Sequence, residues 1–153
     1  MCYIVEGYTD VISMHQNGIE NVVSASGTAL TLEQIKLINR LAQNVVLLFD
    51  GDNAGIKATY KSINMILKEG MNVKIAAFPE GEDPDSFSKK LATDEFRQFL
   101  TTEAIDFIDY KINISKLNTI SDPTKITTIK RDIIASISCI PDSLNRSQYC
   151  KTY

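Results

Sequence analysis

The sequence changes abruptly from apolar to acidic at Val45-Val46-Leu47-Leu48-Phe49-Asp50-Gly51-Asp52. Five apolar residues, β-branched at their start and too few for a helix, predict a strand that is buried on both faces. In an open parallel sheet, ligands bind just outside the carboxyl ends of the strands, where Asp50 and Asp52 would lie. These two carboxylates repel each other unless a cation lies between them, and a hard divalent cation suits such ligands. A solvated Asp-Gly turn explains the tripeptide equally well.

Strands and helices alternate along the first 78 residues. Short apolar runs predict strands at 2–5, 21–25, 45–49 and 73–78. Helical spacing predicts helices at 8–17, after Thr31 (which forms a capping box with Gln34), and at 54–69. This alternation predicts an α/β fold, a parallel four-stranded sheet with flanking helices. Acidic residues from at least three strand ends would then meet at one edge: Glu6, Asp50, Asp52, Asp83 and Asp85.

The pattern becomes helical after about residue 85. Apolar residues continue at helical spacing, with no strand predicted between them. Asp122-Pro123 predicts the start of a helix, whose isoleucines would form a buried stripe: Ile126, Ile129, Ile133, Ile137 and Ile140. We therefore expect a domain at 1–90 and a helical subdomain at 91–153. The first strand begins almost at residue 1 and the last helix has no terminator, so we expect a fragment of a longer protein.

Composition narrows the class of protein. A hydrophobic content of 44% and a charged content of 23% are ordinary for a globular chain, and no apolar stretch of 18 residues is present. Three cysteines without metal-ligand spacing indicate a reduced, cytosolic chain with no zinc site. The net charge of −3 comes from residues 1–90, which hold 11 acidic and 8 basic residues. A surface that grips nucleic acid should be basic, so we expect that surface to lie outside this chain.

Three segments together resemble the Toprim domain, which primases and topoisomerases share. They are Val5-Glu6-Gly7-Tyr8-Thr9-Asp10-Val11, Phe49-Asp50-Gly51-Asp52-Asn53-Ala54-Gly55 and Asp83-Pro84-Asp85. Ser26-Gly27-Thr28-Ala29-Leu30-Thr31, followed by Gln34-Ile35, is similar to bacterial replicative primases of the DnaG type. Residues 1–90 resemble the Toprim domain, and residues 91–153 resemble the start of the helical part that completes the RNA polymerase domain of those primases.

The resemblance implies a role for each acidic residue. Glu6 matches the Toprim glutamate, and Asp50 and Asp52 match its paired aspartates, so these three would be catalytic. The implied metal ligands are Glu6, Asp10, Asp50, Asp52, Asp83 and Asp85, with Glu6 open to either a ligand or an acid/base role. The implied cofactor is Mg²⁺ or Mn²⁺, because two cations can activate the attacking hydroxyl and stabilise the leaving pyrophosphate.

The same resemblance implies a function and partners. Such primases make short RNA primers for DNA replication from ribonucleoside triphosphates. They use a single-stranded DNA template, form an RNA–DNA hybrid, and contact the replicative helicase within the primosome. This implies a bacterial, cytoplasmic, nucleoid-associated protein without a membrane partner. The zinc-binding module, the basic subdomain and the helicase-binding module are absent from these 153 residues, so we expect the chain alone to be inactive or very weak.

Weaker candidates and alternatives remain at this stage. Lys57, Ser26 and Thr28 could bind substrate, but a solvated lysine and an ordinary turn explain them as well. A phosphoacceptor receiver domain also places acids after two strands, but it needs a lysine after a fifth strand, and the sequence predicts no fifth strand. Another Toprim protein, either a metal-dependent nuclease or a non-catalytic replication or repair scaffold, is the main alternative to a primase.

Overall fold

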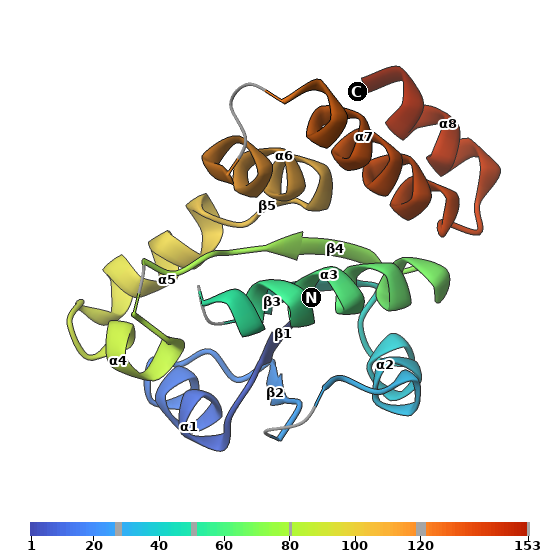
Figure 1. The fold of residues 1–153 in the computed structure, drawn as a ribbon. Coiled ribbons are helices and arrows are strands. Elements are labelled where there is room, and N and C mark those ends of the chain that lie inside the picture. Colours follow the sequence, from blue (N-terminus) through green and yellow to red (C-terminus); the bar gives the residue numbers. More distant parts are fainter. Residues whose placement is uncertain (27–28, 50–51, 80, 119–121, 153) are drawn as a thin grey trace.

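A five-stranded sheet lies at the centre of the protein (Figure 1). The structure is a computed structural model that describes residues 1–26, 29–49, 52–79, 81–118 and 122–152. Its elements are β1 (Cys2–Val5), α1 (Tyr8–Gln16), β2 (Val22–Ser24), α2 (Leu32–Asn39), β3 (Asn44–Leu48), α3 (Asn53–Lys68), β4 (Asn72–Ile75), α4 (Pro84–Ser88), α5 (Thr93–Thr102), β5 (Ile105–Asp106), α6 (Phe107–Asn118), α7 (Pro123–Ser138) and α8 (Ser143–Thr152). None of the helices in these ranges is long and apolar enough to cross a membrane.

The predicted parallel α/β sheet is confirmed, but its predicted size of four strands is wrong. The strand order is β2-β1-β3-β4-β5, and β1 to β4 are parallel. β5 is an additional strand that pairs antiparallel with β4, with Ile75 opposite Ile105. Two residues are too few to show an alternating pattern in the sequence, so only the tertiary pairing reveals this strand. The sheet thus continues beyond residue 90.

The register aligns the carboxyl ends of the parallel strands. Val5 of β1 lies opposite Leu48 of β3, and Leu47 lies opposite Ile75 of β4. The residues that follow these strands therefore emerge at one edge of the sheet, as the sequence predicts.

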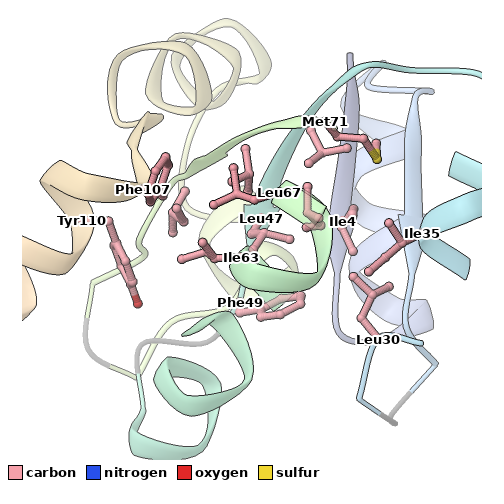
Figure 2. Close-up of a cluster of buried hydrophobic side chains, with 14 of the residues drawn as sticks. Ile4, Leu30, Ile35, Leu47, Phe49, Ile63, Leu67, Met71, Phe107 and Tyr110 are labelled. Carbon is pink, nitrogen blue, oxygen red and sulfur yellow. The ribbon is translucent and has the colours of Figure 1, made fainter. Parts of the chain in front are cut away.

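Alternate residues of the strands fill two separate cores. Ile4 and Leu47 point to the face covered by α2, α3, α6 and α7, and Figure 2 shows them packed with Ile35 and Ile63. The intervening residues point to the opposite face, where α1, α4 and α5 contribute Met14, Phe96 and Leu100 among others. Successive side chains of a strand point to opposite faces, so burying both faces requires apolar residues at each of the four buried positions of β3, Val45 to Leu48.

Helix caps agree with the sequence more closely than the isoleucine stripe does. Thr31 and Gln34 form the predicted capping box, and Asp122 caps α7 by accepting a hydrogen bond from the Thr124 amide at 2.9 Å. Ile137 and Ile140 are buried as predicted, but Ile126 is 43% exposed. The described contacts of α7 with the core come from its later turns, which leaves its first turn in solvent.

A buried lysine joins three helices on the first face. The side chain of Lys111 (α6) is 1% exposed, and its ammonium lies 2.6 Å from Asp132 and 2.7 Å from the Ser136 hydroxyl, both on α7. The same ammonium lies 4.7 Å from the ring centre of Tyr60 on α3. The Ser136 hydroxyl in turn donates to Asn64 of α3 at 2.6 Å. The buried ammonium of Lys111 and the buried hydroxyl of Ser136 thus both have hydrogen-bond partners, which replace the water that they lose on folding.

Candidate metal centre at the carboxyl end of the sheet

Glu6 and Asp52 follow two neighbouring strands at the edge predicted from the sequence. Glu6 is the first residue after β1, and Asp52 is the N-cap of α3, four residues after β3. The Asp52 side chain is exposed, and one of its oxygens accepts a hydrogen bond from the Gly55 amide at 2.7 Å. Asp50 and Gly51 lie outside the described residues, so the role of Asp50 as a metal ligand stays a prediction.

Asp83 is held in place by the start of α4. One carboxylate oxygen accepts a hydrogen bond from the Ser86 amide at 2.6 Å, while the Asp83 amide donates to the Ser86 hydroxyl at 3.1 Å. Pro84 follows at the first helical position, where its fixed φ favours a helix start. Capping therefore orients Asp83 and leaves its second carboxylate oxygen without a capping role.

Asp10 connects the turn after β1 to α4. The Asp10 carboxylate accepts hydrogen bonds from the Gly7 amide at 3.0 Å and from the Asp85 amide at 3.3 Å, and the residue is 5% exposed. Burial raises the pKa of Asp10 above its ordinary value, and the nearby charges of Asp83 and Asp85 add to that rise against the two backbone hydrogen bonds. The structure thus brings Asp10 next to Asp83 and Asp85, although more than 70 residues separate Asp10 from them in sequence.

Asp85 already has positive and polar partners. Lys89, one turn later, donates to Asp85 at 2.7 Å, and the Ser13 hydroxyl of α1 also donates to it. These two bonds, the lysine first, lower the pKa of Asp85. The neighbouring Glu82 likewise has a lowered pKa because it accepts from Lys90 and then Ser86. The helical spacing of Asp85 and Lys89 predicts their contact, whereas only the tertiary fold brings Ser13 to this site.

The structure describes two of the three weaker substrate candidates, Ser26 and Lys57. Ser26 follows β2 at the same edge and has a φ of +62°, which is a left-handed conformation that serine seldom adopts. Thr28 lies outside the described residues. Lys57 is exposed on α3, about one turn after Asp52.

The chemistry of these residues fits a hard divalent cation. All candidate ligands are carboxylate oxygens, which Mg²⁺ and Mn²⁺ prefer, and they come from separate strand ends. Among the residues that the structure describes, no three His, Cys, Asp or Glu side chains are grouped closely enough to hold an ion. Glu6, Asp52 and Asp83 thus supply suitable donors, and a complete ligand set would need Asp50 or a rearrangement of the present side chains.

The similarity of this chain to known proteins covers both the strand–helix part and the helices that follow it. Residues 3–88 match the family described as Toprim-like. The chain is 40% identical over 149 residues to a DNA primase of Clostridium acetobutylicum, a match that covers 97% of this chain and 25% of that protein. The chain thus spans about a quarter of the length of the curated relatives it matches.

Solved structures show the same architecture. A DNA primase domain from Pseudomonas aeruginosa is 33% identical, with a TM-score of 0.82 over 96% of this chain and 47% of that one. A DnaG primase catalytic domain bound to single-stranded DNA is 26% identical, with a TM-score of 0.82 over 99% of this chain and 50% of that one. Because the Toprim-like match covers more than half of the residues and the primase matches continue through the C-terminal helices, this chain belongs to the Toprim-like family, among the relatives of DnaG primases.

Proposed function

We propose that the chain is the catalytic-core segment of a DNA primase, in which residues 1–90 hold the metal and residues 91–153 complete the RNA polymerase domain. The observation that carries this proposal is the primase similarity over 97% of the chain, including the helices beyond the Toprim-like match. A Toprim nuclease or scaffold would explain residues 3–88 but not the continued match through α6, α7 and α8.

We assign different roles to the acidic residues from their contacts. Glu6, Asp50, Asp52 and Asp83 would hold Mg²⁺ or Mn²⁺. Both oxygens of Asp10 accept backbone hydrogen bonds, and Asp85 accepts from Ser13 and Lys89, so these two would position α1 against α4. When bound, two divalent cations activate the attacking hydroxyl and stabilise the leaving pyrophosphate.

The capping contacts contribute to catalysis by fixing the carboxylates before any cation arrives. Asp52 and Asp83 each use one oxygen to cap a helix, which limits their rotamers and keeps the second oxygen available. A preorganised ligand loses little side-chain entropy on metal binding. Glu6, directly after a buried strand, can act either as a further ligand or as an acid/base group.

The proposed substrates and partners follow from the primase assignment. Ribonucleoside triphosphates would be the substrates, and single-stranded DNA, which one structural relative binds, would be the template. The replicative helicase would contact parts of the protein outside this chain, and the protein would act in the cytoplasm at the chromosome. The 153 residues alone should synthesise little primer.

Metal-dependent stabilisation of the chain tests this proposal. A cation at 100 times its Kd should raise the free energy of unfolding by about 2.7 kcal/mol. For a chain of this size, that increase raises Tm by about 5–10 °C. Asparagine caps helices as well as aspartate does, so Asp52→Asn and Asp83→Asn should keep the metal-free Tm but lose most of this shift.

Asp122→Asn is the matched control. It makes the same substitution at the N-cap of α7, away from the strand ends, and should keep the full metal shift. A Tm that Mg²⁺ and Mn²⁺ leave unchanged in the wild-type chain would refute the metal assignment. In the full-length protein, cleavage of nucleic acid by the metal-loaded enzyme without nucleotide incorporation would replace the primase with a nuclease.

A further inference from the structure

The solvent side of α3 carries three lysines and no acidic residue. Lys57, Lys61 and Lys68 are separated by four and seven residues, which places them on one side of the helix. All three are exposed, and none has an ion-pair or hydrogen-bond partner among the described residues. By contrast, Lys89, Lys90 and Lys111 are all paired with carboxylates.

Helix α7, which carries further exposed lysines, packs beside α3. Asn64 of α3 contacts Ser136 of α7, and one turn earlier in both helices Tyr60 and Asp132 share the ammonium of Lys111. The two helices therefore run in the same direction, as Figure 1 shows. Lys125 precedes Asp132 by seven residues, about two turns, so it lies on the same face of α7 as Asp132, in the exposed first turn of that helix.

The one acidic residue of α7 does not offset these charges. Asp132 forms an ion pair with the buried ammonium of Lys111, which neutralises its negative charge. Helices α1, α4 and α5, on the opposite face of the sheet, hold further acids, among them Asp10, Asp85, Asp94 and Glu95. The fold thus separates charges that the net value of −3 averages out.

The position of these lysines relates them to the candidate metal centre. Asp52 caps the first turn of α3, and Lys57 lies about one turn further along the same helix. From Lys57 to Lys68 the helix rises about 16 Å at 1.5 Å per residue. A nucleic-acid strand carries about five phosphates over that length, at 3.4 Å per phosphate in a duplex strand.

We propose that Lys57, Lys61 and Lys68, the lysine row, bind the phosphate backbone of a nucleic-acid strand and lead it to the carboxyl end of the sheet. Lysine ammonium groups act as point charges on phosphates and carry no base specificity, so the row would position the strand without reading its sequence. The nature of the polyanion rests on the proposed function, but binding by the row requires neither metal nor catalysis.

Salt-dependent binding tests the lysine row without involving the metal centre. The probe is a fluorescein-labelled 20-nucleotide single strand, followed by anisotropy between 50 and 200 mM salt with a chelator present. The test variant carries Lys57→Gln, Lys61→Gln and Lys68→Gln, which preserve helix propensity. Each lost contact lowers the slope of log K against log salt by about 0.7, so the slope should fall by about 2 and the affinity at 50 mM by two to three orders of magnitude.

A control variant with the same loss of charge separates the row from general attraction. Lys36→Gln, Lys130→Gln and Lys151→Gln remove three exposed lysines outside the row and should leave the slope nearly unchanged. Equal losses in both variants, or no loss in the row variant, would overturn the proposal. The matching duplex shows which form of the strand the row prefers. Asp52→Asn should keep this binding, so a failed metal assignment would leave the result intact.

Discussion

The paired charges of Lys111 and Asp132 should respond unequally to neutralisation. The Lys111 side chain is 1% exposed, whereas that of Asp132 is 40% exposed. Asp132→Asn leaves a buried ammonium without a counter-charge, which costs about 3–5 kcal/mol. Lys111→Met leaves a carboxylate that water can reach and retains the apolar stem, so we expect a loss of about 1–2 kcal/mol.

The double variant makes this expectation sharper. In the double variant, Lys111→Met has removed the buried ammonium, so Asp132→Asn no longer leaves a buried charge without its partner. The double variant should therefore be more stable than Asp132→Asn alone. For a chain of this length, a difference of about 2 kcal/mol corresponds to about 4–8 °C in Tm.

Urea unfolding followed by circular dichroism at 222 nm measures all three variants. Lys130→Met is the matched control, because Lys130 is an exposed lysine on α7 and its replacement should change stability by less than about 0.5 kcal/mol. A loss of stability in Lys111→Met that equals or exceeds that in Asp132→Asn would contradict this expectation. Simple addition of the two losses in the double variant would also contradict it, since additivity means that the groups do not interact.

Three further substitutions test other parts of the structure. Because the pKa of Asp10 is raised in the folded chain, its contribution to the free energy of unfolding should fall as pH rises from about 4 through that raised value; in Asp10→Asn, urea titrations across this range should show a smaller fall than in the wild-type chain, and the remainder comes from Asp106, whose pKa burial also raises. Gly18 has a φ of +69°, and a Cβ there would meet the Arg97 guanidinium at 2.1 Å, so Gly18→Ala should cost about 1–2 kcal/mol in urea unfolding; an unchanged midpoint would contradict this. Ser26→Gly should match or exceed wild-type thermal stability because glycine adopts the left-handed conformation without strain, while Ser26→Val should lower Tm.

Local sequence patterns were sufficient to predict most elements of the first 78 residues and the start of α7. The buried strand at 45–49, the capping box of Thr31 and Gln34, and the N-cap at Asp122 depend on neighbours within one or two turns, so their patterns are visible in sequence. The shared edge of Glu6 and Asp52 followed from the strand–helix alternation, because right-handed crossovers leave little freedom in the topology.

Contacts between distant segments could not be predicted in this way. β5 has two residues and forms by pairing with the edge of β4. Ile126 lies at a position that the isoleucine spacing predicts to be buried, but it is exposed because the core does not extend to the first turn of α7. Ser13 reaches Asp85 across 72 residues, and Lys111 reaches Asp132 across 21 residues. No local periodicity encodes such pairs.

The placement of charged residues shows most clearly what the sequence determines and what the tertiary structure adds. The sequence by itself determined an acidic strand edge and a net charge of −3, since both depend only on residue types and their order. Only the tertiary structure decided that α3 packs beside α7, that Lys111 is buried against Asp132, and that Lys57, Lys61 and Lys68 lie in solvent. Electrostatic attraction depends on distances in space, and the fold sets those distances.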